Sequence, residues 1–162
     1  MLRPIRPEDE PLEHEFLTTL SKESLRTRFF SAIKDMPHRW LVTFCNIDYD
    51  RSIAIVAEVE ENEKRKIIGV VRLNLNPDFN SGEIAALVHD RFQRRGIGQK
   101  LMALVIEIGR SRGVQEIYGE VLTENEKMLE LCKKLGFATK TLPRGITRIT
   151  LQLNHYQGRM EE

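Results

Sequence analysis

The feature that most constrains this chain is a change in the spacing of its apolar residues. Residues 53–59 and 64–75 are predicted to be strands with alternating side chains, with Val71, Leu73 and Leu75 on one face and Arg72 and Asn74 on the other. Apolar residues then recur at helical spacing over residues 101–108, and residues 116–122 are predicted to be a further strand. A strand, a helix and a strand in that order predict two parallel strands joined by a right-handed crossover. We therefore expect a fold of the mixed α/β (α+β) class.

Further strands and helices are predicted around this unit. They are a strand over Leu2–Arg6, a helix from Pro7 to about Leu20, short helices over Ser21–Phe30 and from Pro37 to Phe44, a strand over Glu83–Val88, a helix over Asn125–Leu135 and a strand over Arg148–Leu153. The three strands that end at Val88 are expected to form an antiparallel meander with a charged hairpin turn at Glu60–Lys66. No repeat or interdomain linker interrupts the pattern, so residues 1–162 are predicted to form a single domain.

Charge and composition argue against several classes of protein. Lys and Arg number 25 against 24 for Asp and Glu, so the chain has no general attraction for nucleic acid or an anionic membrane. The longest apolar run, residues 101–106, is far shorter than the about 20 residues that cross a bilayer, and no signal peptide is expected. With only two cysteines, a disulfide framework is not indicated and a cytoplasmic location is expected.

The segment between the strand at 83–88 and the helix at 101–108 has the composition of a phosphate site. It reads Gln93, Arg94, Arg95, Gly96, Ile97, Gly98, Gln99 and Lys100. The first turn of a helix has unpaired N–H groups and the positive end of the helix dipole, so its backbone can bind phosphate. The two glycines allow a tight bend and a close approach, and the three basic side chains add positive charge. We predict that this segment holds a pyrophosphate.

Other interpretations of this segment are open. The simplest is a turn before an amphipathic helix, with solvated basic residues. A dinucleotide fingerprint would need a third glycine where Leu101 stands, and the Gly-Lys-Ser/Thr of a P-loop is absent. The sequence therefore favours neither a nicotinamide cofactor nor ATP.

Two motifs together resemble the GNAT superfamily of N-acetyltransferases. Gln93-x-x-Gly96-x-Gly98 is similar to the pyrophosphate signature of that superfamily. Asn125-x-x-Met128-x-x-Leu131-Cys132-x-Lys134-x-Gly136-Phe137 is similar to its Asn-x-x-Ala-x-x-Leu-Tyr-x-Lys-x-Gly-Phe segment. The resemblance implies that acetyl-CoA is the acetyl donor. It also implies a mixed, splayed sheet of about six or seven strands with about four to five helices.

A narrower resemblance covers nearly the whole chain. Arg3–Asp9, Ser24–Phe30 and Gly119–Leu122 are similar to the acetyltransferase domain of bacterial Pat-type protein lysine acetyltransferases. The large acyl-CoA-synthetase-like region of many such proteins has no counterpart in these residues. The resemblance implies a protein lysine as the acceptor, in either a stand-alone relative or an excised domain.

Acetyl transfer to an amine requires a group that removes a proton. A free lysine has a pKa of ~10.4 and is almost wholly charged at neutral pH. The resemblance implies that Glu83, in a Glu-Ile-Ala pattern, is the general base, acting directly or through one water. Glu120 on the neighbouring strand is the second candidate, and an exposed acid at a strand end is the alternative interpretation of Glu83.

The resemblance also implies how the donor is held. The strand that ends at Leu87 and Val88 is implied to separate from the strand at 116–122, with the pantetheine arm in the gap. An N–H group near Val88 would then polarise the thioester carbonyl. Asn125 and Met128 are the implied contacts of the arm, although Asn125 equally suits a helix N-cap.

Cys132 is a departure from the superfamily. It stands where many members have a tyrosine that protonates the departing thiolate, and a thiol is a weaker donor. We treat Cys132 as a candidate general acid, with an acetyl-cysteine relay and a buried, inert thiol as alternatives. The inert thiol is favoured because no activating histidine is near it in the sequence.

Direct transfer to a protein lysine is the leading hypothesis for the acceptor. A small amine, a protein N-terminus and a non-catalytic acyl-CoA-binding sensor are the alternatives. No metal is predicted, because the four histidines (His14, His38, His89 and His155) lie too far apart for a local ligand pattern. We expect no nucleic-acid or membrane partner, and a homodimer stays open.

Overall fold

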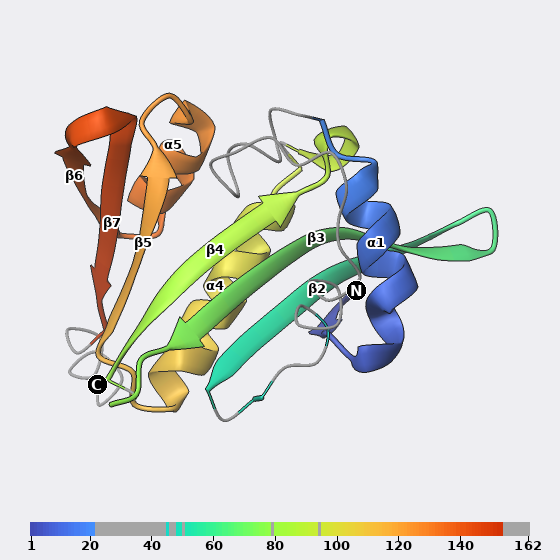
Figure 1. Cartoon of the computed structure of the whole chain (residues 1–162), viewed down its shortest axis with the longest axis horizontal. Helices are drawn as coiled ribbons and strands as arrows, with labels where there is room; N and C mark the ends of the chain where they lie inside the picture. The colour runs from blue at the N-terminus through green and yellow to red at the C-terminus, as the bar shows by residue number, and fades with distance from the viewer. Residues whose placement is uncertain (22–44, 46–47, 50, 79, 94, 154–162) are drawn as a thin grey trace.

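A computed structural model describes residues 1–21, 45, 48–49, 51–78, 80–93 and 95–153. The elements are β1 (Leu2–Pro4), η1 (Pro7–Asp9), α1 (Glu10–Thr18), β2 (Ser52–Glu61), β3 (Lys64–Leu75), β4 (Ser81–Val88), η2 (Asp90–Phe92), α4 (Ile97–Ser111), β5 (Glu116–Leu122), α5 (Glu126–Lys134), β6 (Ala138–Leu142), η3 (Pro143–Gly145) and β7 (Ile146–Gln152). The strands form one sheet in the order β1-β2-β3-β4-β5-β7-β6, with α1 and α4 on opposite faces (Figure 1).

The mixed α/β class is confirmed, with some differences in the number of elements. The described residues contain seven strands, in agreement with the prediction, and three α-helices instead of four to five. The two helices expected over Ser21–Phe30 and Pro37–Phe44 lie almost wholly outside the described residues. The predicted helix before them is divided into η1 and α1, because Pro7 starts a 3-10 turn and Pro11 a new first turn.

The antiparallel meander β2-β3-β4 is also confirmed. Asn62 and Glu63 have φ angles of 52° and 65°, and they connect the last pair of β2 and β3, Glu61 and Lys64. Two consecutive residues with positive φ form the tight turn whose twist matches that of the flanking strands. The hairpin predicted at Glu60–Lys66 is therefore present, but its turn consists of Asn62 and Glu63 alone, and the charged residues on either side belong to β2 and β3.

The parallel pair β4–β5 is short. It consists of Ser81 opposite Glu116, Gly82 opposite Ile117 and Glu83 opposite Tyr118. Beyond these pairs the two strands diverge toward their carboxyl ends (Figure 1). The splayed sheet that the sequence resemblance implied is thus present.

One strand was missed from the sequence. β6 pairs antiparallel with β7, and β7 begins at Ile146, two residues before the predicted start. Four of the five β6 residues are exposed and the fifth is half-buried, so the segment lacks the apolar alternation of a half-buried strand. It is an edge strand, and its stability comes from pairing with β7 instead of from burial.

Apolar cores cover both faces of the sheet. On one face, Leu101, Met102 and Val105 of α4 pack on Leu73 and Ile117 of the sheet. On the other face, Phe16 and Leu17 of α1 form a second cluster. They pack with Ile5, Val56, Val70 and Leu87. These residues are all less than a tenth exposed. Each face is therefore held by burial of apolar area, worth roughly 25 cal/mol per Å².

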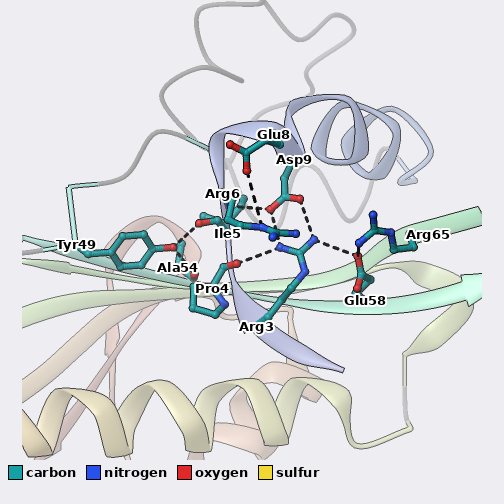
Figure 2. Close-up of polar contacts among 10 residues, drawn as sticks. All are labelled: Arg3, Pro4, Ile5, Arg6, Glu8, Asp9, Tyr49, Ala54, Glu58 and Arg65. Carbon is teal, nitrogen blue, oxygen red and sulfur yellow. Dashed lines mark hydrogen bonds and ion pairs between the residues drawn. The ribbon is translucent and has the colours of Figure 1, made fainter.

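A charged network fixes the start of α1. Arg3 donates two hydrogen bonds of 2.8 Å to the carboxylate of Asp9 and one of 3.1 Å to Glu58, as Figure 2 shows. The Arg6 N–H donates to Asp9 at 2.7 Å. Burial alone raises the pKa of Asp9, but the bonds from Arg3 and Arg6 outweigh this effect and leave the pKa below its usual value. Arg3 of β1 thus ties Asp9 of η1 to Glu58 of β2.

Candidate active site

The glycine-containing segment forms the start of α4, as predicted. Gly96 is the N-cap residue with a left-handed φ of 79°, and it has no side chain that could cap the helix. The Lys100 N–H donates to the Gly96 carbonyl at 3.1 Å, so the N–H groups of residues 97–99 precede the first α-helical hydrogen bond. The first turn of α4 contains no acidic residue. The positive end of this helix can therefore bind an anion.

Gly98 lies where three elements meet. A Cβ atom added at this residue would lie 3.4 Å from Leu131 of α5 and 3.5 Å from Val88 of β4, which are ordinary van der Waals distances. Protein packing therefore leaves room for alanine, even though glycine lowers helix stability by about 1 kcal/mol. A close approach by a ligand is the remaining physical reason for glycine here. The two sequence motifs, one on α4 and one on α5, meet at this point.

Basic side chains surround the start of α4. Arg95 and Lys100 are exposed, and the Arg95 guanidinium lies 5.3 Å from the centroid of the Phe92 ring. Arg91 contacts the same ring at 5.5 Å and forms an ion pair with Glu61 at 3.6 Å. Arg94, also predicted to contribute, lies outside the described residues. Two positive groups are thus directly available next to the unpaired N–H groups.

Gln93 connects this segment to the end of β4. Its side-chain amide donates to the Val88 carbonyl at 3.0 Å and lies 3.5 Å from Asp90 Oδ1. The glutamine side chain therefore sets the distance between β4 and the start of α4. We refer to the segment 93–100, with its exposed first-turn N–H groups, as the cradle.

The backbone of β4 is open toward the gap between the strands. The His89 N–H donates to the Ile68 carbonyl at 2.7 Å, continuing the β3–β4 register in which Leu87 and Val70 are paired. Because backbone groups in an antiparallel ladder alternate in direction, those of Ala86 and Val88 point away from β3. The pairing with β5 does not reach these two residues. The backbone groups of Ala86 and the Val88 N–H thus face the space beside the cradle, while the Val88 carbonyl accepts the bond from Gln93.

Glu83 is exposed at the point where the strands separate. It lies between Asn74 of β3 and Tyr118 of β5, and its side chain is on the face of the sheet that α1 covers. Glu120, the second candidate base, is exposed two residues beyond Tyr118 on the same face. The structure therefore brings both candidate carboxylates to one face. Only Glu83 is part of the paired segment of β4 and β5.

Tyr118 and Arg148 are site neighbours that the sequence reasoning missed. The Tyr118 hydroxyl donates to the Asn76 side chain at 3.2 Å, and the Arg148 guanidinium lies 4.7 Å from the centroid of the Tyr118 ring. Arg148 is directly opposite Glu120 in the β5–β7 register. The alternation of β5 places Tyr118 and Glu120 on one face, but their distance from Glu83 depends on the parallel register, which the sequence does not show.

Asn125 and Met128 begin α5, near the cradle. The Asn125 side chain accepts a hydrogen bond from the Met128 N–H at 3.4 Å, so the predicted N-cap is present. Both residues are half-buried. The cap leaves the Asn125 amide group available as a donor, because the carbonyl oxygen alone makes the bond.

Cys132 is fully buried in the core between α5 and the sheet. Burial raises the pKa of its thiol to about 11, against a smaller opposing effect of a backbone hydrogen bond. The sulfur is therefore a neutral thiol near pH 7. This state is the one expected of an inert core cysteine.

The part of the chain that the structure describes contains no group of three or more His, Cys, Asp or Glu side chains arranged to hold a metal ion. None of its helices combines the length and the apolar character needed to span a bilayer.

Comparison with known proteins identifies relatives of this chain. A family model described as the acetyltransferase (GNAT) family matches residues 18–137. An acetyltransferase of Pseudomonas aeruginosa is 30% identical over 153 residues, which are 94% of this chain and 82% of that protein. The acetyltransferase Pat of Mycolicibacterium smegmatis is 32% identical over 137 residues, which are 83% of this chain and 40% of that protein.

Solved structures share the fold. The GNAT domain of Pat from S. lividans has a TM-score of 0.84 at 24% identity, covering 93% of this chain and 89% of that domain. The spermidine N-acetyltransferase of Vibrio cholerae, solved with CoA and spermine, has a TM-score of 0.75 at 20% identity, covering 97% of each chain.

Proposed function

Because this chain belongs to the GNAT family of acetyltransferases, we propose that it transfers the acetyl group of acetyl-CoA to a lysine side chain of a protein, with Glu83 as the general base. An N-acetyltransferase activity with acetyl-CoA as the donor follows from the family. The acceptor and the roles of individual residues are the proposal. The observation that carries it is the exposed Glu83 carboxylate at the opening between β4 and β5.

The cradle would bind the pyrophosphate of acetyl-CoA. The free N–H groups of residues 97–99 and the side chains of Arg95 and Lys100 offer donors and positive charge at one place. Gly98 permits the phosphate oxygens to approach the backbone. We include Arg94, Gln93 and Gln99 in this site because they belong to the same short segment.

The pantetheine arm would then enter the gap between β4 and β5. The outward-facing backbone groups of Ala86 and the Val88 N–H would offer it strand-like hydrogen bonds, and the Val88 N–H would donate to the thioester oxygen as negative charge develops there. Asn125 and Met128 would border the arm from α5. This path leads from the cradle toward Glu83, so the two ends of the donor are assigned to two separate parts of the site.

The chemistry requires one base and a nucleophilic amine. Glu83 removes a proton from the ammonium group, directly or through one water, and the neutral nitrogen attacks the carbonyl carbon. The tetrahedral intermediate collapses with cleavage of the C–S bond, the nitrogen loses its second proton to water, and the CoA thiolate leaves. Cys132 makes no contribution to this step in our proposal, because its thiol is buried in the core. The thiolate leaves without a proton from that position.

Transfer to a protein lysine has two alternatives: transfer to a small amine, and acyl-CoA binding without turnover. The similarity to Pat supports a protein lysine, whereas the fold is shared with a spermidine N-acetyltransferase, so a small polyamine is the second candidate. Glu83, Glu116 and Glu120 lie on one face and would also attract a cationic small amine. A sensor without turnover is the third candidate.

The decisive experiment compares acceptors under identical conditions. Labelled acetyl-CoA is incubated with the protein and with a lysate of its source, with spermidine, or with a peptide that has only a free N-terminus. Labelling of polypeptide lysines, identified by mass spectrometry, supports the proposal. Turnover confined to spermidine or to the N-terminus overturns the acceptor assignment. Binding of coenzyme A without turnover on any amine overturns the catalytic role.

A further inference from the structure

The residues that join β4 to the cradle are held by Thr19 and Ser21, which directly follow α1, as well as by the sheet. Thr19 Oγ1 lies 3.0 Å from His89 Nε2. The carboxylate of Asp90 accepts hydrogen bonds from the Ser21 N–H at 2.8 Å and from the Ser21 hydroxyl at 3.1 Å. We refer to these four residues as the α1 latch.

The hydrogen bonds around His89 have a consistent direction. The Arg91 N–H donates to His89 Nδ1 at 3.3 Å, so this nitrogen is an acceptor. The neutral imidazole then carries its proton on Nε2 and donates to Thr19, whose hydroxyl donates to the Glu15 carbonyl at 2.8 Å. A continuous chain of hydrogen bonds thus leads from the backbone of α1 to the segment before the cradle.

Asp90 lies between the helix and the cradle. Its Oδ2 accepts the bond from the Ser21 N–H and its Oδ1 the bond from the Ser21 hydroxyl. The same Oδ1 lies 3.5 Å from the Gln93 side-chain nitrogen, which donates to the Val88 carbonyl. Gly96 starts α4 three residues after Gln93. A shift of α1 relative to β4 would therefore move Asp90 and, through it, the Gln93 side chain.

Apolar packing between α1 and this segment is incomplete. A pocket of about 290 Å³ lies between them, with Leu12 and Phe16 of α1 on one side and His89 and Phe92 on the other. The ring centroids of Phe16 and His89 are 6.3 Å apart. Thr19 and His89 also line this pocket, so their hydrogen bond joins the two sides across it.

We propose that Asp90 is a positioning residue that couples acetyl-CoA binding at the cradle to the placement of α1 over the acceptor face of the sheet. The inference rests on the proposed location of acetyl-CoA. α1 packs on the same face that carries Glu83, so its position bears on acceptor binding. A coupling of this kind is reciprocal: a change on α1 alters cofactor affinity, and bound cofactor alters acceptor affinity by the same factor.

The test uses two aspartates at opposite ends of β4. Asp90 and Asp78 are both exposed, and each accepts a backbone N–H bond in a loop, from Ser21 and from Asn80 respectively. We expect Asp90→Ala to weaken coenzyme A binding about threefold to tenfold in calorimetry, which is the effect of losing one or two hydrogen bonds. Asp78→Ala should leave the affinity unchanged. Asp90→Asn should restore part of the affinity, because an amide oxygen still accepts.

A double-mutant cycle separates coupling from a loss of stability. Ser21→Ala removes the hydroxyl that donates to Asp90, although Ser21 itself is not part of the cradle. The substitution should weaken coenzyme A binding when made in the wild type and have no further effect when made in Asp90→Ala. Additive effects, or equal coenzyme A affinity in wild type and Asp90→Ala, would overturn the coupling while leaving the proposed function intact. A wild-type protein that does not bind coenzyme A would overturn both.

Discussion

Glu83 and Tyr118 form the last of the three parallel pairs between β4 and β5. On the side of Ser81 the backbone is paired on both edges, and on the side of Val88 it is open toward the gap. The carboxylate is therefore attached to a rigid part of the sheet and lies next to an opening. A general base needs this combination, because its position must be fixed while its substrate must have access.

The role of Glu83 can be tested by removing its charge at constant shape. We expect Glu83→Gln to lower kcat by about a hundredfold or more, the usual contribution of a general base, with unchanged affinity for acetyl-CoA. Glu120→Gln is the matched control, since Glu120 is also an exposed glutamate on the same face. Steady-state kinetics and calorimetry measure the two effects. A larger loss for Glu120→Gln would exchange the roles of the two carboxylates.

Gly98→Ala should separate stability from cofactor binding. The added Cβ atom meets only ordinary contacts with Leu131 and Val88, and alanine favours a helix by about 1 kcal/mol over glycine. We therefore expect an unchanged or higher Tm and much weaker binding of coenzyme A. Gly113, with a φ of 84°, offers the opposite control: Gly113→Ala should lower the Tm and leave the affinity unchanged. Normal coenzyme A binding by Gly98→Ala would contradict the proposed position of the pyrophosphate.

The carboxylate of Asp9 should make stability depend on pH in the acid range. Its pKa is lower in the folded protein than in the unfolded chain, where it is about 4. The folded state thus favours the ionised form, so this stabilisation is present above about pH 4 and is lost as the pH falls through the folded pKa.

Asp9→Asn tests this sign directly. We expect the variant to be less stable than the wild type by about 3 kcal/mol at pH 7, because the Arg3 guanidinium loses a buried ionic partner. Urea unfolding followed from pH 7 to pH 3 should show that the difference shrinks in acid. A stability difference that stays constant down to pH 3 would show that ionisation of the Asp9 carboxylate does not stabilise the fold.

Both described cysteines should be unreactive in the native protein. Burial raises the pKa of Cys132 to about 11 and that of Cys45 to about 12, so both remain neutral thiols at pH 8. A thiol reagent should modify them only after unfolding in denaturant. Cys132→Ala should cost about 1–2 kcal/mol of stability as a core truncation and leave kcat nearly unchanged. Loss of activity in a folded Cys132→Ala variant would revive a chemical role for this thiol.

Much of the fold was predictable because it depends on local patterns. The meander, the crossover helix and the Asn125 cap follow from periodicity and capping within a few residues, and each is present. β6 was not predictable in this way: its exposed residues show no apolar period, and only its pairing with β7 makes it a strand. The start of α4 at Ile97 was predictable for the same local reason as the caps.

The sequence by itself determined the types of most elements, β6 excepted, and the chemistry of the cradle, since a glycine N-cap and an acid-free first turn are properties of neighbouring residues. Tertiary structure alone decided which residues distant in the chain lie together. The β4–β5 register places Tyr118 beside Glu83, and Asp90 receives its bonds from Ser21. These contacts join segments far apart in sequence, and their pairing depends on burial and register across the whole sheet, which no local pattern specifies.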